Sequence, residues 1–140
     1  MSDAFIIDAV RTPRGKRNGA LAHTHPIDLA TIPLKEIIRR TGIDPATVDE
    51  VIYGCVSQRE EQDNVIAREA ALAAGFPESV AGYTVNRFCG SGLTAVNAAA
   101  HACMAGQDDL VVAGGVEHMT RVPMALDYNM KGSLLEKRYP

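Results

Sequence analysis

One stretch of this 140-residue chain decides its fold: Asn86-Arg87-Phe88-Cys89-Gly90-Ser91-Gly92-Leu93. The residues that lead into it, 82–88, carry β-branched and aromatic side chains in alternation and predict a strand. From Gly92 to Ala105 the chain is rich in alanine and predicts a helix. Cys89 is therefore expected at the point where a strand turns into a helix.

This position suits a reactive thiol. The first N–H groups of a helix have no intrahelical acceptor, and the positive end of the helix dipole favours an anion there. The thiolate is the nucleophilic form of cysteine, so a helix start favours the reactive state. Gly90 and Gly92 leave room for a ligand or for backbone to approach closely. The competing interpretation is a cysteine that only packs, as buried cysteines usually do.

The rest of the chain alternates between strand and helix patterns. Strands are predicted at 4–12, 50–56, 82–88 and 110–116, and helices within 28–40 and over 64–74 and 92–105. This order, βαβαβαβ, predicts an α/β domain over residues 1–140 with a mainly parallel sheet and right-handed crossovers. The strand over 110–116 is apolar enough to be central, and the helix over 92–105 is expected to be a buried central helix.

Two local features of the first helix pattern carry expectations of their own. Pro33 lies inside it, so the helix either begins at Pro33 or is kinked there. Glu36 and Arg40 are four residues apart and predict a surface ion pair.

Composition excludes several classes of function. A net charge of −3 and the absence of tryptophan argue against nucleic-acid binding. The three cysteines show no metal-binding spacing, and their odd number favours a reducing, cytoplasmic setting. The uncharged run 88–107 is long enough to cross a bilayer, but its small and polar residues favour a soluble core helix and no membrane span.

A histidine is predicted to lie near Cys89. His118 follows the strand over 110–116, and the carboxyl ends of parallel strands meet at one edge of the sheet. His118 could therefore approach Cys89 and form a Cys–His pair, or it could be a loop histidine that orders its own turn. His101 is excluded as a base because it lies about 18 Å further along the same helix, and Cys103 is excluded likewise.

Several motifs together resemble the thiolase family over essentially the whole chain. They are Arg11-Thr12-Pro13-Arg14-Gly15, then Gly54-Cys55-Val56-Ser57-Gln58 with Gln62 and Ala67-Arg68, then Val85 to Leu93, then Ala113-Gly114-Gly115-Val116-Glu117-His118-Met119. The match is similar to the amino-terminal half of the family only. The resemblance implies one incomplete half of a duplicated, layered fold, so a carboxyl-terminal half is expected to be absent.

The resemblance also implies a chemistry. Cys89 would take an acyl group from a 3-oxoacyl-CoA or from acetyl-CoA, with thiolysis and condensation both left open. His118 and Met119 would bind substrate, and the coenzyme A thioester would be a substrate, with no cofactor and no metal. Glu117-His118-Met119 with Val122-Pro123-Met124 is similar to the fatty-acid oxidation branch. The full protein would be a homo-oligomer, a dimer or a tetramer.

The chain also departs from the family. Glu60-Glu61-Gln62-Asp63-Asn64 stands where the family usually carries glycine. The activating histidine and second cysteine of the family belong to the other half, so the isolated chain is expected to be inactive. The alternative is a non-catalytic fragment, or a split-enzyme subunit that works only with a partner chain. A ketoacyl-carrier-protein synthase relative is disfavoured by Arg11-Thr12-Pro13 and by the Gly-Gly-Val-Glu motif.

Overall fold

The computed structural model describes residues 3–124. Its described residues form a parallel three-stranded sheet of β1 (Glu50–Gly54), β2 (Ala81–Val85) and β3 (Val111–Gly115), in the order β2-β1-β3. Gly54 pairs with Val85 on one side and with Gly115 on the other, so the three strands end level at the same edge. The loops that follow the strands therefore leave the sheet side by side.

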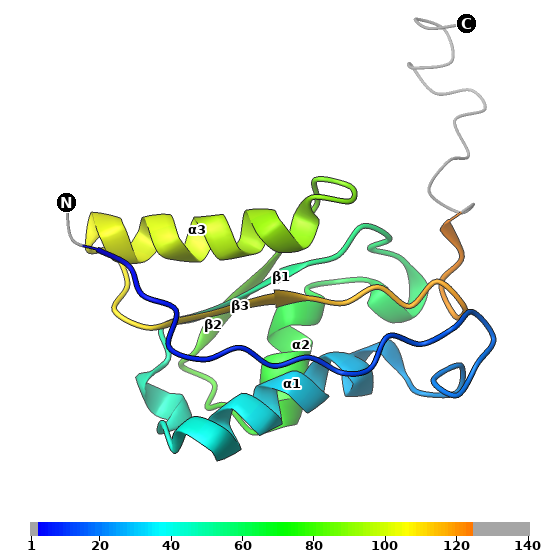
Figure 1. The fold of residues 1–140 in the computed structure, drawn as a ribbon, viewed down its shortest axis with the longest axis horizontal. Coiled ribbons are helices and arrows are strands. Elements are labelled where there is room, and N and C mark those ends of the chain that lie inside the picture. Colours follow the sequence, from blue (N-terminus) through cyan, green and yellow to red (C-terminus); the bar gives the residue numbers. More distant parts are fainter. Residues whose placement is uncertain (1–2, 125–140) are drawn as a thin grey trace, which may run out of the picture.

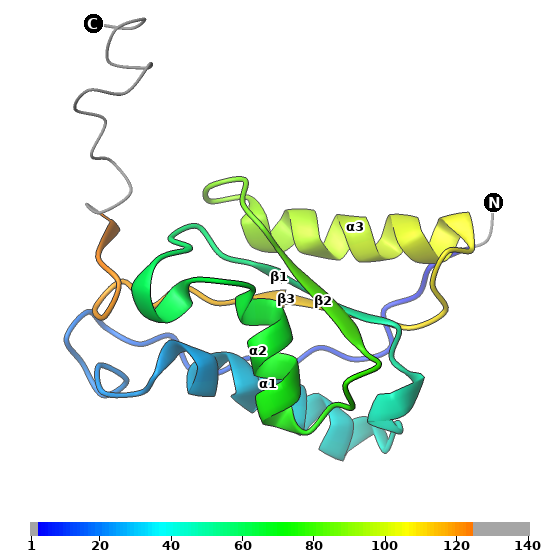
Figure 2. The ribbon, with the colours of Figure 1, turned by 180° about the vertical axis from the view of Figure 1, so that it is seen from behind.

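Helices cover both faces of the sheet. Helix α3 (Ser91–Ala105) lies on one face, and α1 (Pro26–Thr41) and α2 (Ile66–Ala74) lie on the other, as Figures 1 and 2 show from opposite sides. Two short 3-10 turns, η1 (Pro45–Thr47) and η2 (Glu60–Gln62), complete the described elements. The α/β architecture with parallel strands predicted from the sequence is confirmed.

The two faces of the sheet bury different amounts of apolar surface. The main core lies between the sheet and α1 and α2, and it includes Leu34, Val51, Tyr53, Ile66 and Ala70. On the α3 side, a smaller cluster joins Ile52 of β1 to Ala95 and Ala99. Small alanines on α3 allow the helix to approach the strands closely, which brings its first turn next to the strand ends.

The ends of the helices follow from local sequence. Helix α1 begins at Pro26 after His25, whose Nδ1 accepts a hydrogen bond from the N–H of Ile27 at 3.2 Å. It continues through Pro33 to Gly42, which adopts a left-handed conformation with φ of 69°. Pro33 therefore lies inside the helix instead of at its start. Glycines in the same conformation, Gly75 and Gly106, end α2 and α3.

The amino-terminal strand predicted at 4–12 is not part of the sheet. The segment carries no strand in the structure, and Phe5, Ile6 and Ile7 are exposed by 82%, 81% and 68%. The described sheet ends at β2 and β3, and the segment pairs with neither of these edge strands. Because no fourth strand pairs with β3 within the described residues, β3, which we expected to be central, is an edge strand and is half-buried.

Two further details concern the burial of α3 and an ion pair on α1. Helix α3 is buried on one face only: Ala95 is fully buried, whereas Leu93 is 68% exposed. The ion pair expected between Glu36 and Arg40 is formed instead by Glu36 and Arg39, and Arg40 pairs with Asp8 at 3.2 Å. Within residues 3–124, no helix has the length and apolarity needed to cross a membrane.

Candidate active site

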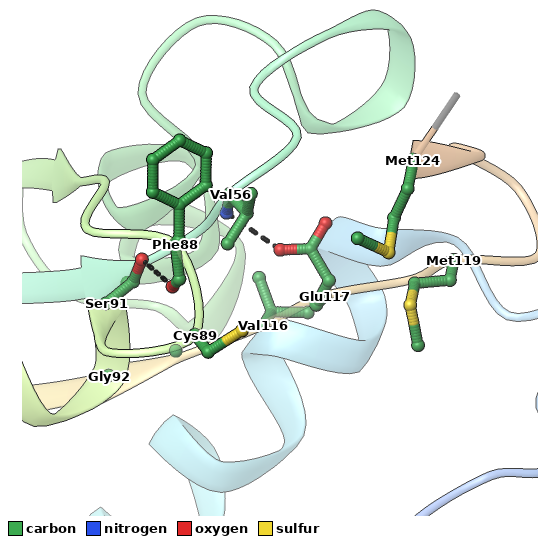
Figure 3. Close-up of a pocket in the computed structure, with 11 residues that line it drawn as sticks. Val56, Phe88, Cys89, Ser91, Gly92, Val116, Glu117, Met119 and Met124 are labelled. Carbon is green, nitrogen blue, oxygen red and sulfur yellow. Dashed lines mark hydrogen bonds between the residues drawn. The ribbon is translucent and has the colours of Figure 1, made fainter. Parts of the chain in front are cut away.

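The loops that follow the three strands line an open cavity of about 510 Å³ at the edge of the sheet. Figure 3 shows the cavity with Cys89 and Ser91 on one side and Met119 and Met124 on the other. Its lining is mostly apolar and consists of Gly54, Val56, Phe88, Cys89, Ser91, Gly92, Gly115, Val116, Glu117, Met119 and Met124. A cavity of this kind suits a small molecule that has an apolar portion.

Cys89 lies in a tight turn between β2 and α3. The N–H of Gly90 donates to the carbonyl of Arg87, and the N–H of Ser91 donates to that of Phe88, each at 3.0 Å. Phe88 has a left-handed backbone, with φ of 47°, which is unusual for a bulky residue. The turn presents the thiol of Cys89 on the surface of the cavity, where the residue is exposed. The predicted placement of Cys89 at a strand-to-helix junction is confirmed.

Ser91 secures this turn with its side chain. Its hydroxyl donates to the carbonyl of Phe88 at 2.6 Å and accepts the N–H of Arg87 at 2.9 Å. The N-cap of α3, Gly90, supplies no side-chain acceptor, and the first helical turn holds no acidic residue. The positive end of the helix dipole is therefore not compensated by a protein side chain, and it is available to an anion at Cys89 or beside it.

Glycines allow the strand ends to lie against the helix start. A Cβ built on Gly54 would lie 2.5 Å from the backbone nitrogen of Gly92, and one built on Gly115 would lie 2.7 Å from the carbonyl oxygen of Gly54. Real Cβ atoms do not approach backbone so closely, so any side chain at Gly54 would push α3 away. The Gly-Cys and Gly-Gly motifs noted in the sequence thus act by close backbone contact.

The cavity wall also contains a carboxylate, that of Glu117. One of its oxygens accepts the N–H of Val56 at 2.7 Å (Figure 3). The other accepts the N–H of Ser57 at 3.2 Å and the side-chain amide of Gln62 at 3.1 Å. Both oxygens are thus engaged by donors, so Glu117 is arranged to hold the loop after β1 and is poorly arranged to take a proton from Cys89.

His118 points away from the cavity. Its side chain is buried, with Nε2 2.9 Å from the carbonyl of Leu21 and Nδ1 accepting the N–H of Arg121 at 3.3 Å. These partners fix the tautomer with the proton on Nε2, and they leave neither ring nitrogen for a thiol. The open alternative of a Cys–His pair is therefore not formed, and His118 orders its own loop. Its predicted contact with substrate has no support in this geometry, whereas Met119 does line the cavity.

The other candidates lie where the sequence placed them. His101 and Cys103 are on α3, ten and twelve residues after its first residue, and neither lines the cavity. Cys55 is buried behind the strand end. Within residues 3–124, no three side chains of histidine, cysteine, aspartate or glutamate cluster in a way that could hold a metal ion.

Sequence reasoning did not assign a role to Asn86, Gln62 or Val56. Asn86 precedes Cys89 by three residues and binds the carbonyl of Val56 with its amide at 2.9 Å. Gln62 is fully buried, and its side-chain oxygen accepts the N–H of His118 at 2.6 Å. The sequence does show Asn86 close to the cysteine and Gln62 in an acidic loop. It does not show their partners, Val56 and His118, which lie 30 and 56 residues away.

Comparisons with known proteins agree with the geometry. A family model described as "Thiolase, N-terminal domain" matches residues 4–139. The chain is 50% identical over 125 residues to a steroid 3-ketoacyl-CoA thiolase of Mycobacterium tuberculosis, covering 89% of this chain and 31% of that protein. It is 49% identical over 127 residues to a 3-oxoadipyl-CoA/3-oxo-5,6-dehydrosuberyl-CoA thiolase of Escherichia coli, covering 90% of this chain and 32% of that protein.

A solved structure is similar as well. The crystal structure of the Bacillus anthracis acetyl-CoA acetyltransferase aligns with a TM-score of 0.75 and 48% sequence identity, over 79% of this chain and 28% of that chain. The chain thus spans about a third of the length of the curated relatives that it matches.

Proposed function

Because this chain belongs to the thiolase family, we propose that it supplies the nucleophile, Cys89, for acyl transfer between a 3-oxoacyl group and coenzyme A. The observation that carries the proposal is the exposed thiol of Cys89, which faces a mostly apolar cavity at the uncompensated start of α3. Nucleophilic catalysis by a thiolate splits a difficult acyl transfer into two easier steps.

The proposed reaction runs through a thioester on Cys89. The thiolate attacks the 3-oxo carbon, the bond between C2 and C3 of the substrate breaks, and the C2 carbanion of acetyl-CoA takes up a proton. The thiol of coenzyme A then loses its proton and attacks the acyl-cysteine, which releases a shortened acyl-CoA and restores the thiolate of Cys89. Condensation of two acetyl-CoA molecules is the same path in reverse. The N–H groups at the start of α3 would stabilise the negative charge that develops on the carbonyl oxygen.

The acyl substrate is proposed as a class. The motif around Met119 and Met124 supports the fatty-acid oxidation branch, and both methionines line the cavity. The names of the similar proteins extend to steroid and oxoadipyl substrates, so the shared feature is a 3-oxoacyl-CoA. We propose a cytoplasmic setting for the whole protein, in line with its odd number of cysteines. We also propose a homo-oligomer, because α3 carries no charged residue and exposes Leu93 and Val96.

We further propose that the 140-residue chain does not turn over unaided. A single slow acylation of Cys89 can take its proton from water, but repeated turnover needs groups that move protons at every step, and the described cavity wall offers no histidine and no second cysteine. The alternative is a split-enzyme subunit that gains these groups from a partner chain. Mixing this chain with a carboxyl-terminal thiolase half would distinguish the two, because restored thiolysis supports the split enzyme.

A direct test follows the acyl group. The purified chain is incubated with a 3-oxoacyl-CoA, and peptide mass spectrometry locates any thioester, with Cys89→Ser as the control. An acyl group on Cys89 that is absent from the variant supports the nucleophile. Acylation that persists in Cys89→Ser contradicts it. Sustained consumption of coenzyme A by the chain without a partner would contradict the expected lack of turnover.

A further inference from the structure

The backbone of the loop after β1 ties together the three loops that frame the cavity. The carbonyl of Val56, two residues beyond the end of β1, accepts a hydrogen bond from the side-chain amide of Asn86 at 2.9 Å. The N–H of the same peptide group, that of Ser57, donates to Glu117 at 3.2 Å, and the N–H of Val56 donates to Glu117 at 2.7 Å. Asn86 follows β2 and Glu117 follows β3, so the two side chains hold the Val56–Ser57 backbone between them from opposite strands.

Asn86 carries this link to the nucleophile. Its side-chain oxygen accepts the N–H of Phe88 at 2.9 Å, and Phe88 directly precedes Cys89. The amide thus uses its donor on the loop after β1 and its acceptor on the cysteine turn. A side chain with both a donor and an acceptor is needed for the pair of bonds. The backbone at Phe88 is left-handed, so the hydrogen bond from its N–H to the Asn86 side chain helps to hold an unfavourable conformation.

Glu117 is anchored as firmly on the other side. Its second oxygen accepts from Ser57 and from Gln62, and Gln62 is fully buried. The side-chain oxygen of Gln62 accepts the N–H of His118, the residue next to Glu117. Glu117 is therefore fixed at both oxygens, and the position of the Val56–Ser57 backbone depends on it.

We propose that Asn86 and Glu117 are positioning residues, which hold the thiol of Cys89 at the start of α3 by clamping the Val56–Ser57 backbone between them. The catalytic meaning of this clamp rests on the proposed function. The placement of the thiol by this clamp does not rest on the proposed function, and it can be measured without any acyl substrate.

The test is the alkylation of Cys89 by iodoacetamide as a function of pH, with the modified peptide identified by mass spectrometry. Asn86→Ala removes both bonds of the amide. Because Cys89 is already exposed, loosening its turn would not make the thiol more accessible to iodoacetamide. It would move the thiol away from the start of α3, where the helix dipole favours the thiolate. We expect alkylation at neutral pH to be at least about threefold slower. Asn97→Ala, the same change at an exposed position of α3, is the matched control and should leave the profile unchanged.

Glu117→Gln tests the other side of the clamp. The new amide oxygen can accept the N–H of Val56, but the new NH₂ group would then face the donors on Ser57 and Gln62. For this variant, the change in charge and the loss of the clamp predict opposite changes in the alkylation rate of Cys89. Removing a negative charge from the cavity favours the thiolate and would speed alkylation. Loss of the clamp slows it, which is the result we expect.

Each outcome decides the inference. Slower alkylation in Asn86→Ala and Glu117→Gln, with Asn97→Ala unchanged, supports the clamp. Wild-type profiles in both variants overturn it, and so does faster alkylation in Glu117→Gln. If the variants fail to fold, amide hydrogen exchange in the unmodified chain decides, because fast exchange at Val56 and Phe88 would contradict the two bonds. A failure of the proposed function is seen separately, as absence of the acyl group from Cys89.

Discussion

The backbone of Gly54 touches the backbone of Gly92, so the end of β1 and the first turn of α3 meet without a side chain between them. A Cβ on Gly54 would lie 2.5 Å from the nitrogen of Gly92. This contact sets the distance between the sheet edge and the helix whose start carries Cys89. The position of the thiol therefore depends on a residue that contributes no side chain of its own.

Gly54→Ala is expected to disturb the site and to destabilise the fold. The added methyl group meets backbone on both Ser91 and Gly92, which cannot rotate away as a side-chain tip would. We expect a loss of about 1–3 kcal/mol in the free energy of unfolding, measured by urea denaturation. Gly92→Ala is the matched control, because a Cβ at Gly92 meets nothing within 4 Å. Equal losses in both variants would contradict the close contact as the cause.

The left-handed backbone of Phe88 gives a second prediction. Its φ is 47° and its side chain is 65% exposed, so the residue contributes little burial to offset the conformation. Phe88→Asn should keep or raise the stability, because asparagine tolerates this region. Phe88→Val should lower it by about 1–2 kcal/mol, because β-branched residues are excluded from the region. The pair is compared by chemical denaturation. Equal stability of the two variants would argue against strain at this turn.

The main core contains a buried hydroxyl whose loss can be measured. The hydroxyl of Tyr53 donates to the carbonyl of Ala30 at 2.9 Å, which joins β1 to α1. Burial raises the pKa of Tyr53 well above its ordinary value, so the hydroxyl keeps its proton across the accessible pH range. Tyr53→Phe should lower the free energy of unfolding by about 1 kcal/mol at any pH in that range. Tyr83→Phe, in a 37% exposed side chain on β2, should change it much less.

Much of the fold was accessible from local sequence. The three helices and the strands over 50–54, 81–85 and 111–115 fall within or near their predicted ranges. The glycines that end the helices and the spacing of apolar residues are local signals, which a few neighbouring residues are enough to reveal. Cys89 was placed correctly for the same reason. The segment at 4–12 has the composition of a strand, but composition does not report whether a segment pairs with a neighbouring strand. The outer edges of β2 and β3 are open in the described sheet, and the segment pairs with neither.

The site was harder to predict, because its polar contacts are long-range. The ring of His118 is held by Leu21, 97 residues earlier, and the carboxylate of Glu117 by Val56, 61 residues earlier. Sequence placed His118 and Cys89 at one edge of the sheet, which is correct, but a strand end does not fix where a side chain points. The direction of the ring is decided by a carbonyl that no local pattern identifies.

A half-buried ion pair beside this network should make the stability of the fold depend on pH. The guanidinium of Arg121, in the loop after β3, pairs with the carboxylate of Glu61 in η2. The hydrogen bond from Arg121 holds the pKa of Glu61 below its ordinary value. A carboxyl with a lowered pKa in the folded state stabilises the fold above its unfolded pKa, and this contribution is lost as the pH falls through the folded pKa. Glu61→Gln should therefore unfold at a lower temperature than the unmodified chain at neutral pH, and the two midpoints should converge in acid. Glu78→Gln, which removes a negative charge from an exposed loop, controls for net charge. A difference in midpoint that persists below the pKa of Glu61 would show that the pair does not cause it.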